Sequence, residues 1–550
     1  MNFNRTGRQI RSSIALMACL LAACGGGGGG DSGAPSPSPP PAPAPDSYGP
    51  ALEGTATISR LAVPAVTPLP AAALPKPLYN QRYLPTGRKI AWGDFNGDGL
   101  NDLIMCPSFF SSRPLLPCEI WLNRGGGTFT IGTSEVAEGV LGPQAGVNSI
   151  FVADFNGDGK PDVFIATQGQ EDPDASNPDG FKSRNRVFMS QPGGKLKDTT
   201  ATALASDTVG FHHPSAMGDI DGDGWLDIAI CELGGLQGSG QATGLYFLLN
   251  DRRGGFVRST AGLPVDLAST DFTGPNPPQL DHFGPGTVRL VDLDGDGRLD
   301  LVTTTYIWGT ASTHAHETRV YQQQADRTFL LRNSIAYPAQ LAAMGASDGT
   351  GLGASGIVAG DIDGDGRPDL VILFENMGIS GAFAQVLRND GDFSFTDTTA
   401  SWLGKYDLTI RQQGASTQTI GVSAVKLIDL NNDGKLDLYL SQGGFFHNAL
   451  ASVSPFYLND GTGKLAPWMP LIGGKRFLGQ TLPDPQWIDL LKIPYTNNTD
   501  LLAFDATGDG LVDWVFIDGL TDPSTEPPVP IDGMYTENAI FIRVVPQVAK

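Results

Sequence analysis

Aspartate, asparagine and glycine recur in a nine-residue pattern whose oxygen atoms are suited to binding a metal ion. The first copy reads Asp94-Phe-Asn96-Gly-Asp98-Gly-Leu100-Asn-Asp102, and further copies begin at Asp154, Asp219, Asp292, Asp361, Asp429 and Asp505. We name these segments loop 1 to loop 7 and number the positions of each from 1 to 9. Calcium is a hard cation that takes about six to eight oxygen ligands. Side-chain oxygens at positions 1, 3, 5 and 9, with a backbone carbonyl at position 7, predict one calcium ion per loop, up to seven in all.

The predicted calcium ligands share this spacing in every loop. They are Asp94, Asn96, Asp98, Leu100, Asp102, Asp154, Asn156, Asp158, Lys160, Asp162, Asp219, Asp221, Asp223, Trp225, Asp227, Asp292, Asp294, Asp296, Arg298, Asp300, Asp361, Asp363, Asp365, Arg367, Asp369, Asp429, Asn431, Asp433, Lys435, Asp437, Asp505, Thr507, Asp509, Leu511 and Asp513. Position 6 is glycine in all seven loops, which predicts a tight turn with positive φ there. Loop 7 has the weakest ligand set, because its position 3 is a neutral threonine hydroxyl.

Two other interpretations of the pattern fit the residues less well. An EF-hand loop also begins with alternating aspartates, but it needs a glutamate at position 12 and a helix on each side. Position 12 here is Met105, Ile165, Ile230, Thr303, Ile372, Leu440 or Phe516, and none of these side chains has a carboxylate. Metal-free turns would hold three or four carboxylates close together in each loop, where like charges repel. We therefore favour calcium.

Short apolar segments flank the loops and predict the strands that position them. Residues 90–92 precede loop 1, residues 102–105 continue from its last aspartate, and the other loops have similar flanks. A Gly/Asn turn such as 123–127 then joins two more strands, so each repeat predicts a four-stranded antiparallel sheet. Radial repetition of such sheets is a β-propeller. The predicted fold is all-β, a seven-bladed propeller whose last blade is closed by an N-terminal strand near residues 54–60.

The loops and the Leu-Asn-x-Gly turns that follow them resemble FG-GAP/VCBS repeats, which form the propeller of integrin α-subunits and occur in many bacterial surface proteins. Phe283-Gly284-Pro285 resembles the FG-GAP signature itself. The resemblance covers about residues 85–550 and implies a propeller with bound calcium. It does not imply one activity, because propellers host many functions.

The N-terminus has the features of a bacterial export signal. Three arginines precede a ten-residue apolar stretch that is too short to span a bilayer, and Leu-Ala-Ala-Cys24 resembles a lipobox. The resemblance implies a signal peptide over residues 1–23, lipidation of Cys24 and, because the next residue is glycine, an outer-membrane location in the cell envelope. A flexible Gly/Pro/Ala tether over residues 24–50 then leads to the propeller over residues 51–550. The alternative is an ordinary secretory signal with a chance cysteine.

Net charge and cysteine positions limit the remaining possibilities. The formal charge of −22 argues against a nucleic-acid partner, whose phosphates need clusters of Lys and Arg, and suits a cation-binding protein. Cys106 and Cys118 bracket one segment and predict a disulfide in an oxidising compartment. Cys231 is then predicted to be a small buried residue outside any disulfide.

The segments at the other end of the predicted blades contain all six histidines of the chain. They define a possible ligand site of His213, His282, His314, His316 and Trp308 on the face opposite the calcium loops. The simpler interpretation is that these histidines cap loops by hydrogen bonding, because short histidine clusters are unspecific motifs.

Three classes of function are compatible with the sequence. The first is a calcium-binding adhesion or interaction module that binds a protein or glycan on that opposite face and touches the membrane only through its lipid anchor. The second is a polysaccharide-acting enzyme, a lyase or dehydratase, with its site at the histidines; we nominate no catalytic residue. The third is a structural or assembly lipoprotein. We favour the first, because long segments rich in Asn, Asp and aromatic residues suit sugars or protein partners.

Overall fold

A computed structural model provides the structure of the protein. It describes residues 65–68, 88–107, 116–144, 146–167, 184–207, 210, 212–232, 244–268, 285–307, 317–338, 352–376, 381–403, 422–430, 433–442, 456–468, 471–472, 475–476, 501–510, 512–519 and 540–545. Within these residues, the helices are all too short or too polar to cross a membrane.

The described strands form sheets that follow one another along the chain, and we name each group of strands after the loop that it contains. Group 1 consists of β2 (Arg88–Gly93), β3 (Asp102–Pro107), β4 (Leu116–Asn123) and β5 (Phe129–Ile131), with β7 (Leu141–Gln144) paired to β4. Group 2 consists of β8 (Val147–Ala153), β9 (Asp162–Thr167), β10 (Arg186–Ser190) and β11 (Leu196–Asp198), with β6 (Ala137–Glu138) added to β11 in parallel. The short helices α1 (Thr133–Val136) and α2 (Thr200–Ala203) follow β5 and β11 respectively.

Groups 3, 4 and 5 have the same antiparallel order. Group 3 consists of β12 (His212–Gly218), β13 (Asp227–Glu232), β14 (Gly244–Asn250) and β15 (Phe256–Ser259). Group 4 consists of β16 (Pro285–Val291), β17 (Asp300–Ile307), β18 (Glu317–Gln323) and β19 (Phe329–Ala336). Group 5 consists of β20 (Leu352–Gly360), β21 (Asp369–Asn376), β22 (Gly381–Gly391) and β23 (Ser394–Asp397), followed by the π-helical turn η7 (Thr399–Leu403). Groups 4 and 5 merge into one sheet because the end of β17 also pairs with β20.

The last groups complete the described chain. Group 6 consists of β24 (Val422–Ile428), β25 (Asp437–Gln442), β26 (Phe456–Asn459) and β27 (Leu465–Trp468). A small hairpin of β28 (Leu471–Ile472) and β29 (Lys475–Arg476) follows. Group 7 consists of β30 (Leu501–Phe504), β31 (Asp513–Gly519), β32 (Ile540–Val545) and, from the other end of the chain, β1 (Ala65–Pro68).

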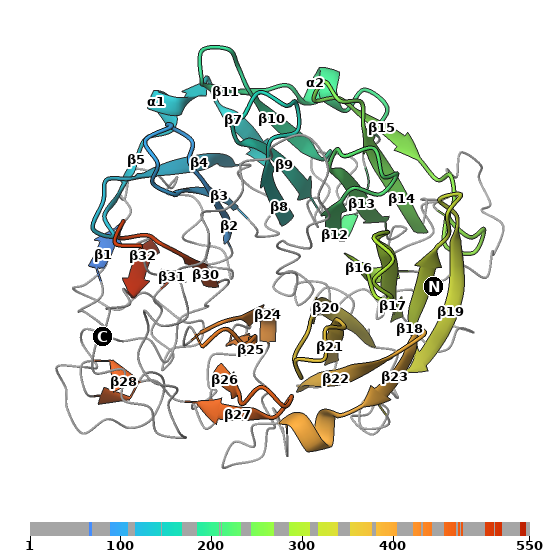
Figure 1. The fold of residues 1–550 in the computed structure, drawn as a ribbon. Helices are drawn as coiled ribbons and strands as arrows, with labels where there is room; N and C mark the ends of the chain where they lie inside the picture. The colour runs from blue at the N-terminus through green and yellow to red at the C-terminus, as the bar shows by residue number, and fades with distance from the viewer. Residues whose placement is uncertain are drawn as a thin grey trace, which may run out of the picture.

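The hydrophobic core lies between neighbouring groups. Phe164 of group 2 packs with Tyr246 of group 3, and Val302 of group 4 packs with Ile372 of group 5. Successive side chains of a strand point to opposite faces, so one group can bury both of its faces against its two neighbours. Figure 1 shows the groups arranged around a common centre, with their first strands innermost: β2, β8, β12, β16, β20, β24 and β30.

Residues from both ends of the described chain meet in group 7. β1 pairs antiparallel with β32, with Ala65 opposite Val544. The sequence predicted an N-terminal strand in this group near residues 54–60, which lie outside the described residues; the strand that pairs with β32 is instead Ala65–Pro68. Groups 1 and 7 also share a core, in which Ile90 and Trp121 pack with Phe504.

The cysteines outside the N-terminal segment lie where the sequence predicted. Cys106 and Cys118 form a disulfide that joins β3 to β4, twelve residues apart in sequence. Cys231 is buried in β13 as a thiol. The disulfide therefore fixes the start of β4 relative to β3 in the first group.

Candidate metal centres

Each of the seven loops connects the innermost strand of a group to the second strand. In group 1, Gly93 at the end of β2 lies opposite Asp102 at the start of β3, so loop 1 spans the turn between two paired strands. Groups 2 and 5 show the same register, with Ala153 opposite Asp162 and Gly360 opposite Asp369. All the loops therefore lie at the same end of their groups, as the apolar flanks in the sequence predicted.

The carboxylate of the position 1 aspartate accepts hydrogen bonds from backbone N–H groups of its own loop. In loop 1, Asp94 Oδ1 accepts hydrogen bonds from the Gly97 N–H at 2.7 Å and the Asp98 N–H at 3.1 Å, and Oδ2 accepts one from the Gly99 N–H at 2.8 Å. The bonds from positions 5 and 6 to this carboxylate recur in the other loops. Position 6 has positive φ in every loop, from +79° at Gly159 to +89° at Gly224, which confirms the predicted turn.

The position 9 aspartate ties each loop to the sheet. Asp102 is fully buried; its Oδ2 accepts a hydrogen bond from the Phe95 N–H at 2.9 Å, and its Oδ1 accepts one from the Asn123 N–H at the end of β4 at 2.8 Å. Burial raises the pKa of Asp102 to about 7 despite these two bonds. Burial also raises the pKa of the equivalent residues: Asp162 to about 6, Asp227 to about 7, Asp300 to about 7, Asp369 to about 6 and Asp437 to about 8.

A divalent cation would offset the free-energy cost of keeping these buried carboxylates ionised. Desolvation favours the neutral acid, whereas a nearby positive charge favours the ionised form. A carboxylate that accepts one N–H per oxygen still has lone pairs left for a metal ion. The position 9 aspartates therefore fit a hard cation that binds through oxygen.

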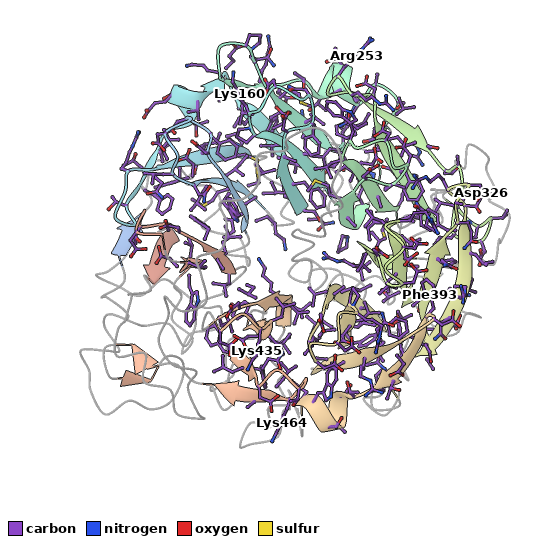
Figure 2. All side chains as sticks on the ribbon, viewed as in Figure 1. Lys160, Arg253, Asp326, Phe393, Lys435 and Lys464 are labelled. Carbon is purple, nitrogen blue, oxygen red and sulfur yellow. A yellow bond between two sulfur atoms is a disulfide. The ribbon has the colours of Figure 1, made fainter. Side chains whose placement is uncertain are left out.

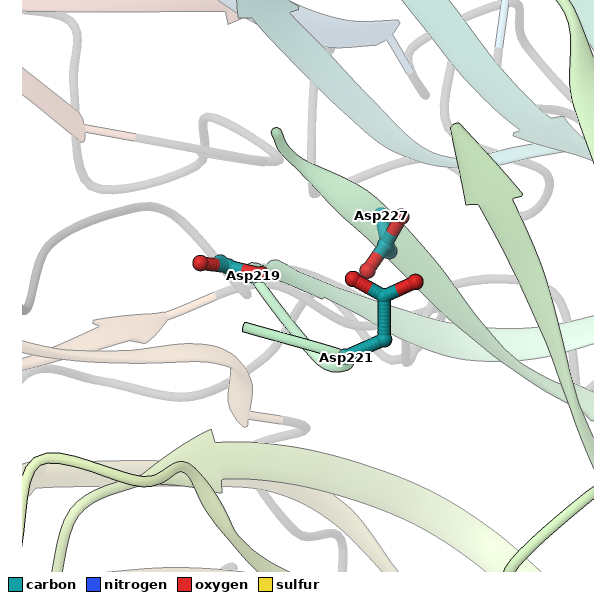
Figure 3. Close-up of side chains that lie close together, drawn as sticks. All are labelled: Asp219, Asp221 and Asp227. Carbon is teal, nitrogen blue, oxygen red and sulfur yellow. The ribbon is translucent and has the colours of Figure 1, made fainter. Parts of the chain in front are cut away.

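Three loops bring carboxylates close enough to share one ion. Asp219, Asp221 and Asp227 of loop 3 each offer an oxygen within 4.8 Å of the others, and Figure 3 shows their carboxylates converging. Equivalent groups are formed by Asp292, Asp294 and Asp300 in loop 4 and by Asp361, Asp363 and Asp365 in loop 5. These three loops are the ones with aspartate at all four side-chain positions. Their donor sets are compatible with calcium.

Arginine accompanies the extra aspartate in these same three loops. Arg252 Nε lies 2.7 Å from Asp223 Oδ2 in loop 3. Arg298 pairs with Asp296 in loop 4, and Arg367 pairs with Asp365 in loop 5. In loops 1 and 2, which have an asparagine at position 3, neutral donors serve instead: Asn96 bonds to Asp98, and Ser190 bonds to Asp158. In loops 3, 4 and 5 an arginine thus offsets part of the negative charge at position 5, and Lys435 lies 3.7 Å from the position 5 aspartate of loop 6, Asp433.

A carboxamide at the end of the third strand joins five of the loops (loops 2, 3, 4, 5 and 7) to the next group, and the sequence analysis did not identify this contact. Asn250 Nδ2 donates to the Phe155 carbonyl of loop 2 at 3.0 Å, and Asn389 Nδ2 donates to the Leu293 carbonyl of loop 4 at 3.0 Å. The same bond runs from Gln323 to Ile220 at 2.7 Å and from Asn459 to Ile362 at 2.6 Å. Asn123 of group 1 donates to Ala506 of loop 7 at 2.9 Å. In the sequence, the Asn of the Leu-Asn turn marks this position, but the pattern predicts only a turn there.

Several predicted site residues lie outside the described part of the chain. These are Asn431, Leu511, Cys24, the side chain of His213, His282, His314, His316 and Trp308. The neighbouring His212 is described and is fully buried, with Nδ1 3.0 Å from the Thr167 carbonyl and Nε2 3.2 Å from the Tyr246 hydroxyl. His212 therefore bonds within the core between groups 2 and 3.

Comparison with known proteins identifies the repeat. Residues 94–165 and 292–372 match the FG-GAP-like repeat. Mouse integrin alpha-IIb is 26% identical over 235 residues, which cover 40% of this chain and 20% of that protein. The match thus spans about a fifth of the relative's length.

Two solved structures show weaker likeness. A rhamnogalacturonan lyase of Bacillus licheniformis is 13% identical, with a TM-score of 0.27, over 76% of this chain and 71% of that one. A protein of Bifidobacterium bifidum described as an exo-beta-1,3-galactanase is 13% identical, with a TM-score of 0.25, over 66% of this chain and 94% of that one. Both scores are too low to infer a shared fold.

Proposed function

We propose that this chain, which contains FG-GAP-like repeats, is a calcium-binding seven-bladed β-propeller of the cell envelope that acts as an adhesion or interaction module for a protein or glycan. Groups 1 to 7 are its blades. The observation that carries the proposal is the common position of the loops: all of them occupy one end of the groups, and the opposite end is left for recognition.

Contacts between the first and last groups support a closed ring. Asn123 of group 1 bonds to Ala506 of group 7 with the geometry seen between sequential neighbours. Trp92 and Phe504 pack with ring centroids 5.6 Å apart. β1 adds the fourth strand to group 7 from the N-terminal side. Closure of this kind protects the sheet edges that an open array would expose.

Calcium would be held by the side-chain oxygens of positions 1, 3, 5 and 9 and supplies two positive charges at each loop. Side chains of positions 1 and 9 set the conformation of each loop and its attachment to the strands. The position 1 carboxylate organises the turn, and position 9 links the turn to the second and third strands. The carboxamide transmits the position of one loop to the next blade. The ions therefore stabilise the ring and do not themselves recognise the partner.

The N-terminal segment supports the proposed location in the cell envelope. The proposed partner would bind at the end of the groups opposite the loops. Lipidation at Cys24 would anchor the protein to the outer membrane through the tether of residues 24–50, so the membrane contact needs no part of the propeller. In the sequence, segments 168–183 and 308–316 connect β9 to β10 and β17 to β18, and their composition suits sugars or protein surfaces.

Two measurements test the proposal in sequence. Calcium should raise the melting temperature of the full-length protein, and chelation should lower it by several degrees, because about 1 kcal/mol shifts the melting temperature of a large domain by roughly 2–4 °C. Unchanged melting in chelator would rule out a structural role for calcium.

Binding to a glycan array and to envelope proteins is then compared between the wild type and a quadruple alanine variant of His213, His282, His314 and His316. Lys464→Ala, an exposed change at the loop end, is the matched control. The proposal expects binding to fall only in the quadruple variant, with every bound glycan recovered intact. Shortened or unsaturated glycan products would instead establish the polysaccharide-acting enzyme.

A further inference from the structure

Buried polar atoms without hydrogen-bond partners gather on one face of group 4. The hydroxyls of Thr287, Thr304 and Thr318 and the Nε of Arg289 make no hydrogen bond with the residues that the structure describes. All three threonines are fully buried. Unpartnered buried donors are uncommon in native proteins, and each one calls for an explanation such as a bound ion or ligand.

The strand register brings these four groups together. Thr287 of β16 lies opposite Thr304 of β17, which lies opposite Thr318 of β18, so the three hydroxyls form a row across the sheet. Arg289 is two residues beyond Thr287 on the same strand and therefore shares its face. We call these four side chains the donor cluster.

Residues of group 5 pack against the face that carries the donor cluster. Val302 and Val320, which share that face, pack against Ala354 and Ile357 of β20. Ala354 is small and buried, and so is Gly356 two residues further along the strand. The side chain of Arg289 is partly exposed, and β16 is an innermost strand in Figure 1. Arg289 is therefore the member of the donor cluster that borders the centre of the ring, and the three threonines lie behind it.

Charge at this centre has the opposite sign to that of the whole protein. The chain has a net charge of −22, yet the seven innermost strands contain Arg88, Lys89, Arg289 and Lys426 and neither Asp nor Glu. Lys426 occupies the place in β24 that Arg289 occupies in β16, three residues before position 1 of its loop, and its Nζ donates to the Leu501 carbonyl at 2.7 Å. Figure 2 shows nitrogen-tipped side chains reaching toward the middle of the ring. This local excess of positive charge favours an anion.

We propose that the donor cluster binds a small oxyanion, a carboxylate or sulfate-like group, between β16 and β20. Threonine hydroxyls and a guanidinium N–H can all donate, and an oxyanion accepts at every oxygen. Hydrogen bonds between an ionised donor and an ionised acceptor are stronger than those between neutral groups. Arg289 therefore supplies the positive charge that attracts the anion, and the threonine hydroxyls orient it. The anion comes either from a free inorganic ion or from an acidic group of a larger ligand such as a uronate. This inference is independent of what binds at the loops or on the opposite face.

Thermal unfolding with sulfate replacing chloride at constant ionic strength and constant calcium tests the site. Sulfate is the inorganic probe because phosphate would precipitate calcium. We expect a saturable rise in the melting temperature of the full-length protein. We expect its half-saturation concentration to increase at least tenfold in Thr287→Val and Arg289→Gln. Sulfate also stabilises proteins generally through surface exclusion, but that effect does not saturate and does not depend on Thr287.

Two control variants separate the site from general effects. Thr303→Val makes the same change on the opposite face of β17, where the hydroxyl already bonds to the Thr287 carbonyl, and it should keep the wild-type sulfate response. Arg332→Gln removes an arginine that pairs with Asp392 outside the cluster and should also keep it. Without sulfate, Thr287→Val should melt at or above the wild type, because it removes a buried hydroxyl that has no partner.

Oligogalacturonate and neutral oligogalactose distinguish the two sources of the anion. Saturation by oligogalacturonate at concentrations at least tenfold below those of sulfate assigns the site to an acidic polymer, and saturation by sulfate alone assigns it to a free ion. Crystals grown with selenate should show anomalous density between β16 and β20. A wild type without a saturable response, or an equal response in Thr287→Val, overturns the proposal.

Discussion

Asn123 and Asn389 make the same three side-chain hydrogen bonds at two different boundaries between groups. Asn389 lies between neighbouring groups, where its Nδ2 donates to Leu293 at 3.0 Å and to Pro368 at 3.1 Å, and its Oδ1 accepts from the Gly391 N–H at 2.9 Å. Asn123 lies between the first and last groups and bonds at 2.9 Å to Ala506, at 3.2 Å to Asn101 and at 2.9 Å to the Gly125 N–H. Both side chains are fully buried.

Alanine at either position removes all three bonds and leaves buried carbonyls unpaired. A buried polar group left without a partner costs about 1–3 kcal/mol, and the solvent near the loop surface satisfies part of the loss. We therefore expect Asn389→Ala and Asn123→Ala to lower the free energy of unfolding by about 2–4 kcal/mol each, and by amounts that agree within about 1 kcal/mol.

Urea unfolding of both variants in excess calcium, followed by tryptophan fluorescence and circular dichroism, measures the two losses. Comparison of the midpoints is valid if the slopes match that of the wild type. Asn389→Ala is the internal control, because Asn389 joins groups 4 and 5, which follow each other in the sequence. Two of the three Asn123 bonds lie within group 1, so only the bond to Ala506 reports on closure. A loss for Asn123→Ala that is smaller than that for Asn389→Ala by more than about 1 kcal/mol would show that groups 1 and 7 do not join in solution, and it would refute the closed ring.

Four further outcomes are expected. The calcium-free protein should melt at lower temperature as pH rises from about 5 to about 8. The pKa values of the position 9 aspartates of loops 1 to 6 lie between about 6 and 8 in the folded state, above the unfolded value near about 4. The stability from their bound protons is therefore complete below about pH 4 and is lost as pH passes the folded values. Saturating calcium should abolish this slope, and a melting temperature that rises with pH in calcium-free buffer would contradict the assigned burial. Replacing Cys106 and Cys118 with alanine should cost about 2–4 kcal/mol in urea unfolding, and dithiothreitol should then have no further effect. Gly99→Ala should cost roughly 1–2 kcal/mol because its φ is +86°, whereas Gly193→Ala, which also meets no atom within 4 Å, should change stability by less than about 0.5 kcal/mol; equal losses would show that backbone strain is not the cause. Cys24→Ser should abolish incorporation of a radiolabelled fatty acid into the protein in cells, and retained label would place the lipid elsewhere.

The sequence predicted the parts of the fold that repeat locally. The conformation of each loop is determined within nine residues, because the position 1 carboxylate accepts hydrogen bonds from the backbone N–H groups of the turn that follows it. The flanking strands are predicted by the apolar segments directly before and after the loop. The carboxamide bridges could not be predicted in the same way. Asn123 and Ala506 are 383 residues apart, and the other bridges span 95 to 103 residues, so only the packing of one group on another brings the partners together.

The position of the N-terminal strand was missed for a related reason. The alternating Thr-Ala-Thr-Ile-Ser of residues 55–59 suits a half-buried strand, whereas β1 reads Ala-Val-Thr-Pro. Proline is tolerated in β1 because β1 is the edge strand of its sheet, where one side needs no partner. The pairing with β32 decides which residues form the strand, and β32 is distant in sequence.

The pairing of Ala65–Pro68 with Ile540–Val545 also constrains the order in which the chain can fold during synthesis. β1 is synthesised long before β32, so group 7 cannot acquire its fourth strand until the segments between them have been made. A product truncated before Ile540 would lack β32 and leave both β31 and β1 without their shared neighbour. Unpaired strand edges are templates for pairing with other chains, so β1 and β31 would be sites of aggregation until β32 lies between them.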